Sequence, residues 1–187
     1  MIRLFCAVKI GATEALCSLI DDFRNKLQGE RINWVDPSNL HVTLKFFGDT
    51  PESKEKEISE ALQRAASRLD QLHIRLKGCG TFGNRAAPRV IWVGIEKGSG
   101  LEDLWNGVNK NIRPLGYEPD RRYFVPHLTI GRIKHINRNK ALEDLLEKYS
   151  ESVVGEFRTG SFYLFQSILR PEGPVYIKRG EFRLEKS

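Results

Sequence analysis

Two short segments of the chain place a histidine and a threonine two residues apart. The first is His41-Val42-Thr43 and the second is His127-Leu128-Thr129. In a β-strand, residues i and i+2 point to the same face, so each segment would present an imidazole beside a hydroxyl. The aliphatic residues that follow each histidine and each threonine would face the core. Each segment therefore predicts an apolar-backed strand with a titratable front.

Two such fronts facing each other suit the cleavage of a phosphodiester. The attacking water needs a base and the departing alkoxide needs an acid, and an imidazole with an ordinary pKa of about 6.5 serves in either role near neutral pH. Threonine hydroxyls would donate hydrogen bonds to the non-bridging phosphate oxygens. We therefore predict catalysis by His41 and His127, phosphate binding by Thr43 and Thr129, and no need for a metal or other cofactor.

The remaining candidates carry weaker patterns. His73 and His135 lack a threonine at i+2, and we interpret both as structural or surface residues. The absence of an H-E-x-x-H motif or a Cys/His cluster disfavours a zinc site. Phe46 and Trp92 are possible base-stacking residues, although core packing is the commoner role for each.

Composition favours a globular protein with an anionic partner. The 187 residues carry a net charge of +6, which favours a partner such as nucleic acid. Hydrophobic residues make up 40% and no apolar stretch is long enough to span a membrane. The densest basic group lies beside the second motif and comprises Arg121, Arg122, Arg132, Lys134, Arg138 and Lys140.

Cysteine usage and the first residues bear on the compartment. Cys6, Cys17 and Cys79 are scattered and show no C-x-x-C spacing, which favours a reduced, cytoplasmic protein. Lys9 and Glu14 interrupt the apolar start, so it is predicted to be a strand rather than a signal peptide.

The repeated motif, each copy followed by a predicted helix, indicates two similar half-molecules. Strands and helices alternate, which is typical of the α/β or α+β class, and a final hairpin at 171–174 makes part of the sheet antiparallel. We predict a loop over 80–88 and one domain of two lobes over 1–187. The predicted helices are 12–27, 53–69, 100–113 and 137–149, and the predicted strands are 2–9, 40–47, 71–78, 89–96, 127–133, 156–168 and 174–184.

The segments HVTLKFFG and HLTIGR resemble the motifs of the two-histidine (2H) phosphoesterase superfamily, in particular the RNA 2′,3′-cyclic phosphodiesterases, historically also called 2′-5′ RNA ligases. The similarity extends to the segments 3–5, 34–36 and 88–92, and so covers nearly the whole chain. It implies an α+β, bilobal, pseudo-twofold fold with two mainly antiparallel sheets and outer helices around a basic central cleft.

The resemblance also implies roles for individual residues. His41 corresponds to the proton donor and His127 to the acceptor, Thr43 and Thr129 to the phosphate-binding threonines, and Arg132 to a basic residue that often follows the second motif. The implied partner is RNA with a 2′,3′-cyclic phosphate end, bound by a monomer without a membrane. RNA end-joining by the same histidines, a cyclic mononucleotide substrate and a non-catalytic RNA-binding module remain as alternatives.

Overall fold

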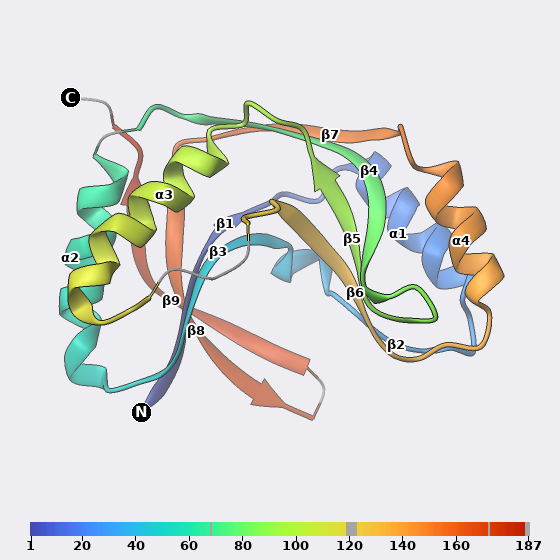
Figure 1. Cartoon of the computed structure of the whole chain (residues 1–187), viewed down its shortest axis with the longest axis horizontal. Helices are drawn as coiled ribbons and strands as arrows, with labels where there is room; N and C mark the ends of the chain where they lie inside the picture. Colours follow the sequence, from blue (N-terminus) through green and yellow to red (C-terminus); the bar gives the residue numbers. More distant parts are fainter. Residues whose placement is uncertain (68, 119–122, 172, 186–187) are drawn as a thin grey trace.

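Two antiparallel β-sheets, each flanked by helices, build two lobes that lie side by side (Figure 1). The computed structural model describes residues 1–67, 69–118, 123–171 and 173–185. Lobe A is the sheet with the strand order β3-β1-β8-β9, and lobe B is the sheet with the order β2-β6-β5-β4-β7.

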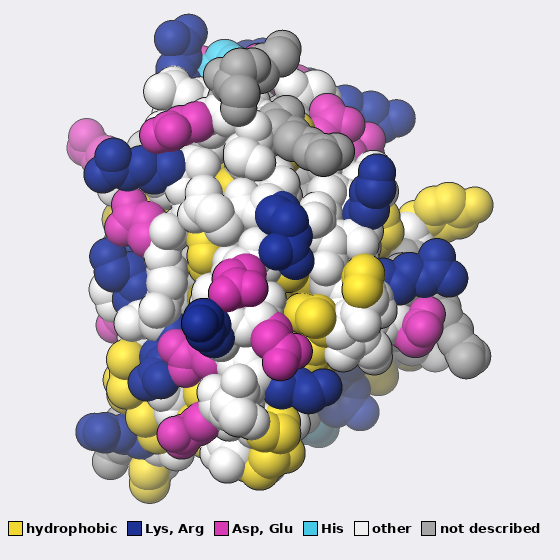
Figure 2. Space-filling model, turned by 90° about the vertical axis from the view of Figure 1, so that its left-hand side faces the viewer, with side chains coloured by type: hydrophobic (Ala, Val, Ile, Leu, Met, Phe, Trp, Pro, Cys, Tyr) yellow, Lys and Arg dark blue, Asp and Glu magenta, His cyan; other side chains and the backbone are white. Residues whose placement is uncertain are grey.

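Lobe A contains the first motif, at the start of β3. Its strands are β1 (Ile2–Lys9), β3 (His41–Thr50), β8 (Ser161–Arg170) and β9 (Gly173–Arg183). Helices α2 (Glu55–Ala66) and α3 (Leu101–Ile112) pack on each other and against β9 and β3. Figure 2 shows the outside of this lobe, where acidic and basic side chains are interspersed. The excess positive charge of the chain is therefore not gathered on that face.

Lobe B contains the second motif, at the start of β6. Its strands are β2 (Arg31–Trp34), β4 (Leu72–Asn84), β5 (Ala87–Ile95), β6 (His127–His135) and β7 (Val153–Thr159). Helix α1 (Glu14–Lys26) contacts β7 and α4 (Asn139–Lys148), which in turn contacts β4. Three short 3-10 turns, Pro37–Asn39, Glu52–Lys54 and Arg113–Leu115, complete the described elements.

The two lobes are related by a pseudo-twofold axis that exchanges the motif strands. The sheet order β3-β1-β8-β9 corresponds to β6-β5-β4-β7, and in each lobe the motif strand is antiparallel to its inner neighbour. The helix after β1 crosses to lobe B, and the helix after β5 crosses to lobe A. Strands β3 and β6 contact each other between the lobes, which brings the two motifs to one place.

Amphipathic spacing explains why the helices form where they do. In α1, Thr13 caps the first turn by accepting a hydrogen bond from the Leu16 backbone N–H at 3.1 Å. The buried residues of α1 then recur at helical intervals and face the core, as Leu16, Leu19, Ile20 and Phe23. All four predicted helices are confirmed, with ends that differ by a few residues.

The prediction of one strand over 156–168 is wrong. Strand β7 ends at Thr159 and β8 begins at Ser161, and the two strands belong to different sheets. The Thr159 hydroxyl lies 3.1 Å from the Ser161 carbonyl and 3.3 Å from its N–H, and this local turn interrupts the strand. The break is not visible in the sequence, because the side chains alternate between the two faces in both β7 and β8, each of which has one buried face.

Two smaller expectations also need correction. The loop predicted over 80–88 is mostly strand, since β4 continues to Asn84 and pairs with β5 from Ala87 onward. Strand β2 is absent from the predicted strands, because its four residues are too few to show a period. The hairpin predicted at 171–174 is confirmed by the pairing of Arg170 with Gly173. Within the described residues, no helix combines the length and apolar character needed to cross a bilayer.

Candidate active site

Both motif strands carry a β-bulge at the same place. On β3, Thr43 pairs with Ala7 and Lys45 pairs with Cys6, so Leu44 is the extra residue. A bulge shifts the alternation of side chains by one position. Lys45 consequently turns inward and is only 5% exposed, and the next residue, Phe46, returns to the face that holds His41 and Thr43.

Strand β6 repeats this arrangement in the other lobe. Thr129 pairs with Trp92 and Gly131 pairs with Ile91, so Ile130 is the extra residue. Gly131 is buried, and Arg132 returns to the face of His127 and Thr129. The two bulges therefore place Phe46 and Arg132 at equivalent positions beside the two motifs.

Each motif histidine is held by a backbone carbonyl two residues before it. The His41 Nδ1 lies 2.6 Å from the Asn39 carbonyl oxygen, and the His127 Nδ1 lies 2.8 Å from that of Val125. A carbonyl only accepts, so each Nδ1 is the protonated nitrogen and donates. With Nδ1 donating, the Nε2 of each ring is the nitrogen that can take up or deliver a proton.

Besides the hydrogen bond at Nδ1, each imidazole has an edge-to-face contact with an aromatic ring. The Tyr176 ring meets His41 edge to face, with centroids 5.3 Å apart and an interplanar angle of 89°. Phe82 does the same for His127 at 4.7 Å and 90°. Tyr176 comes from β9 and Phe82 from β4, so each histidine contacts a ring from another strand of its own sheet.

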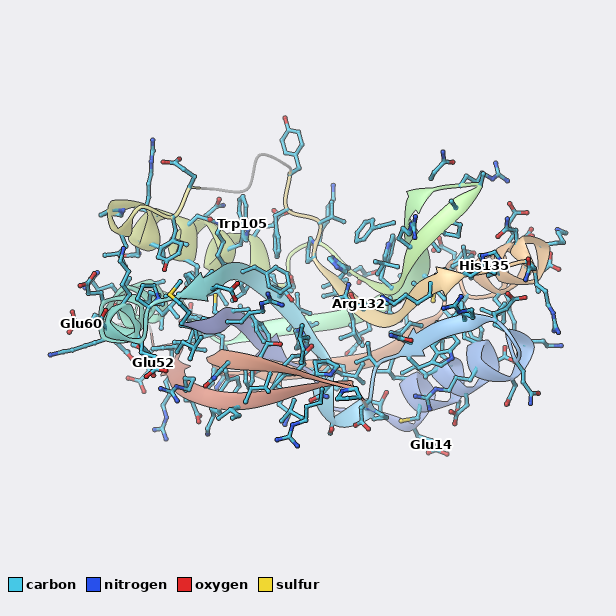
Figure 3. The ribbon with its side chains drawn as sticks, turned by 90° about the horizontal axis from the view of Figure 1, so that it is seen from below. Glu14, Glu52, Glu60, Trp105, Arg132 and His135 are labelled. Carbon is cyan, nitrogen blue, oxygen red and sulfur yellow. The ribbon has the colours of Figure 1, made fainter. Side chains whose placement is uncertain are left out.

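Burial lowers the pKa of both histidines below the ordinary value. The carbonyls of Asn39 and Val125 oppose this effect, and the positive charge of Arg132 adds to it at both rings. A charge on His127 lowers the pKa of His41 further. Arg132 acts on both histidines from between the two lobes, where Figure 3 labels it. Without substrate, both rings are therefore biased toward the neutral form.

A polar hollow of about 590 Å³ opens beside His41. It pairs His41 of the first motif with Thr129 of the second, and Arg132 and Arg170 supply its positive charge. The segment before the first motif and the tip of the β8–β9 hairpin form its walls. They contribute Asn33, Trp34, Val35, Asp36, Ser38 and Asn39, and Gly173, Pro174, Val175 and Tyr176.

An aromatic hollow of about 510 Å³ opens beside His127. Its lining contains His127 of the second motif and Thr43 of the first, so each hollow holds a histidine and a threonine from different motifs. The walls of this hollow come from the segment before the second motif, from β3, from β4 and from α3. They include Leu44, Lys45, Phe46, Phe82, Trp105, Tyr123, Phe124 and Val125.

Several residues singled out in the sequence lie apart from these hollows. Trp92 lies over Gly80 and packs against Phe82 with centroids 5.3 Å apart, and it lines a separate cavity. His73 lies 3.9 Å from the Glu156 carboxylate, and His135 hydrogen-bonds Asn137 at 3.1 Å.

Phe46 departs from the expectation of core packing, since it is 63% exposed and lines the aromatic hollow. The basic group beside the second motif is also divided. Only Arg132 of its described members lines a hollow at the histidines, whereas Arg138 pairs with Glu30 and Lys140 pairs with Asp144. Arg121 and Arg122 lie outside the described residues.

Sequence reasoning missed Asn39, Phe82, Arg170 and Tyr176. Asn39 carries the one local signal, because it stands two residues before its motif histidine, as Val125 does in the other motif. The other three come from segments far along the chain. Nothing in their local pattern points to the histidines.

Comparisons with known proteins show the family to which the chain is related. A family model described as LigT like Phosphoesterase matches residues 10–92 and again residues 93–176, and each match contains one motif. An RNA 2′,3′-cyclic phosphodiesterase of Methanocaldococcus jannaschii is 38% identical over 93% of this chain and 96% of that protein. One of Methanothermobacter thermautotrophicus is 33% identical over 98% of this chain and 99% of that protein.

The fold also matches a solved structure. The crystal structure of TT0787 of Thermus thermophilus superposes with a TM-score of 0.80 at 27% identity, and the match covers 99% of each chain. On the double match of the family model and the identity to curated relatives over almost the full length, the chain belongs to the LigT-like phosphoesterase family.

Proposed function

We propose that this protein hydrolyses the 2′,3′-cyclic phosphate end of RNA to a 2′-phosphomonoester, with His41 as general acid and His127 as general base. The observation that carries the proposal is the matched pair of histidines, each with Nδ1 engaged by a carbonyl and Nε2 left for proton transfer. The relatives named above are RNA 2′,3′-cyclic phosphodiesterases and share nearly the whole chain with it.

The proposed step is one in-line displacement at phosphorus. Water gives a proton to the His127 Nε2 as its oxygen bonds to phosphorus, and the bond from phosphorus to O3′ breaks as O3′ takes the proton of the His41 Nε2. The phosphate then remains on O2′. The acid role of His41 follows the family resemblance, since both rings have the same kind of carbonyl and edge-to-face contacts.

Thr43, Thr129 and Arg132 are proposed to bind the non-bridging phosphate oxygens. Each hollow combines a histidine with the threonine of the other motif, so a phosphate between the two motifs would receive hydroxyl donors from both lobes. The guanidinium of Arg132 would offset the charge that accumulates on these oxygens in the transition state.

The aromatic hollow is proposed to hold the base of the terminal nucleotide. Phe46 exposes its ring there, and Trp105 stacks on Phe124 with centroids 5.2 Å apart and an interplanar angle of 8°. Base stacking on an aromatic ring contributes about 1–3 kcal/mol for each base. The position of Trp92 behind Phe82 favours packing over stacking for that residue.

We further infer a cytoplasmic monomer that acts on RNA. The three cysteines are free, and burial raises the pKa of the Cys79 thiol to about 12, which suits a reduced and unreactive thiol.

A single experiment tests the activity. An oligoribonucleotide ending in a 2′,3′-cyclic phosphate is incubated with the protein, and the product is assigned by phosphorus NMR. A 2′-phosphomonoester is expected, formed at a rate that His41→Ala and His127→Ala each reduce. A 3′-phosphomonoester, or no reaction, would contradict the proposal. Adding an RNA with a 5′-hydroxyl end tests for joining, which would appear as a longer product.

A further inference from the structure

The two hollows beside the histidines differ in chemistry although the pseudo-twofold axis makes them equivalent. The hollow beside His127 is lined mainly by aromatic side chains. The hollow beside His41 has a mixed lining, in which Trp34, Val35, Pro174, Val175 and Tyr176 stand beside amide and hydroxyl side chains, and it is distinguished by two arginines, Arg132 and Arg170. The first suits a flat base and the second suits an anion.

The bonding within the terminal ribose predicts which part of the substrate would face each hollow. In a 2′,3′-cyclic end, C3′ is bonded to C4′, which carries C5′ and the preceding phosphodiester, whereas C2′ is bonded to C1′, which carries the base. If His41 protonates O3′, the C4′ side of the ribose faces the polar hollow. The base then faces the opposite way, toward the aromatic hollow. This step rests on the proposed function, because it uses His41 as the acid.

The β8–β9 hairpin brings Arg170 to the polar hollow. Strand β1 pairs with β8 only over residues 163–166, so the rest of β8 continues with β9 alone as its neighbour. Figure 1 shows this hairpin projecting from the sheet of lobe A. Its tip, where Arg170 pairs with Gly173, lines the hollow beside His41.

Asn39 ties the hairpin to the catalytic centre. Its side-chain amide donates to the Pro174 carbonyl at 3.3 Å, and its own carbonyl accepts from the His41 Nδ1 at 2.6 Å. Tyr176, further along the hairpin, packs edge to face on the His41 ring. The hairpin tip is thereby held beside the histidine that faces O3′.

The charges around the polar hollow favour an anion. No described carboxylate forms an ion pair with Arg132 or Arg170. Asp36 also lines the hollow, and the Ser38 hydroxyl and N–H, which donate to its Oδ1 at 2.6 and 2.8 Å, lower the pKa of its carboxyl and keep it charged. Among the described lining residues the two arginines outnumber this carboxylate, so the hollow keeps a net positive charge. The guanidinium of Arg170 would therefore be able to pair with the negative charge of a phosphate bound in this hollow.

We propose that the polar hollow is a subsite for the phosphodiester on the 5′ side of the terminal ribose, and that Arg170 is its specificity-determining contact. The enzyme would then prefer an oligonucleotide end to a cyclic mononucleotide, which lacks that phosphodiester. Arg132 would remain with the cyclic phosphate at the centre. A charged hydrogen bond at a partly exposed site corresponds to about a tenfold preference.

The test compares kcat/KM for adenosine 2′,3′-cyclic phosphate and for the dinucleotide ApA with the same cyclic end. Wild type is expected to favour the dinucleotide about tenfold, and Arg170→Ala should remove most of that ratio. A dinucleotide with an uncharged methylphosphonate linkage should also lose the advantage. Arg183→Ala is the matched control, because Arg183 is exposed at the opposite end of the same strand pair, where it pairs with Ser161.

Three results would overturn the subsite: equal kcat/KM for both substrates in wild type, the same loss on both substrates in Arg170→Ala, or an equal change of the ratio in Arg183→Ala. Failure of wild type to hydrolyse either substrate would overturn the proposed function itself, together with the subsite. Thermal unfolding of each variant distinguishes a folding defect from a lost contact. Should Arg170→Ala unfold, Arg170→Gln is expected to show the same fall in the ratio, and an unchanged ratio there would refute the proposal.

Discussion

Phe46 and Arg132 occupy equivalent positions, each five residues after its motif histidine and each returned to the histidine face by a bulge. One is an exposed aromatic ring in the hollow beside His127, and the other is a cation in the hollow beside His41. The axis that makes the two histidines alike therefore relates an apolar residue to a charged one. This difference gives the cleft a direction, with one half suited to a base and the other to phosphate.

The first prediction concerns the two histidines. His41→Ala and His127→Ala should each lower turnover by about 100-fold or more, the usual scale for general acid–base groups. Both variants should keep the fold, because each ring lies on the cleft side of its strand and the core face is formed by the aliphatic neighbours. Steady-state kinetics and circular dichroism measure the two quantities. Near-normal turnover in either folded variant is incompatible with the mechanism.

The second prediction is a shift of the pH profile on removal of Arg132. Activity needs His41 protonated and His127 neutral, so kcat/KM should be bell-shaped. The Arg132 charge lowers the pKa of both rings, and Arg132→Met should therefore raise both pKa values and move the optimum to higher pH.

Arg183→Met removes a charge of the same sign far from the cleft and serves as the control. Its optimum should stay where wild type has it. An optimum that moves to lower pH in Arg132→Met, or does not move, would contradict the assignment that this guanidinium lowers the pKa of both histidines.

The third prediction assigns acid and base. Ribose O3′ leaves as a strongly basic alkoxide, whereas a 3′-thiolate, with a cysteine-like pKa of about 8.5, departs without a proton. With a 3′-thio 2′,3′-cyclic substrate, His41→Ala should recover much of its lost rate and His127→Ala should stay slow. Rescue of His127→Ala instead would mean that the two roles are reversed. If wild type turns the analogue over and neither variant is rescued, both histidines are better explained as phosphate-binding groups.

The fourth prediction concerns the support behind His127. A Cβ at Gly80 would lie 2.2 Å from Cζ2 of Trp92, whose ring packs on Phe82, which in turn packs edge to face on His127. Gly80→Ala should therefore displace the indole, cost about 1–3 kcal/mol of stability and lower turnover.

Chemical denaturation and kinetics measure these two effects of Gly80→Ala. Gly107→Ala is the matched control, because Gly107 lies in α3 and its Cβ would meet Ala65 of α2 at an ordinary 3.8 Å. Equal behaviour of the two variants would rule out a role for Gly80 in supporting His127.

The sequence by itself determined the local features of the site. Side chains alternate between the two faces of a strand, and this alternation predicted that His41 and Thr43 share one face and that His127 and Thr129 share another, with aliphatic residues on the opposite faces. The structure has both strands, β3 and β6. The helical spacing predicted all four helices for the same reason, since a buried face imposes its period on the residues that form it. The family motifs were visible because they are contiguous.

Only the tertiary structure decided which residues meet. A local period shows which face a side chain takes and does not show what lies opposite, so the pairing of each histidine with the threonine of the other motif could not be predicted. The bulges at Leu44 and Ile130 depend on the neighbouring strand, because a bulge is a mismatch between two strands. Tyr176 reaches His41 although β9 and β3 are opposite edge strands of their sheet, because the β8–β9 hairpin continues beyond its pairing with β1 and is tied to Asn39 beside the motif.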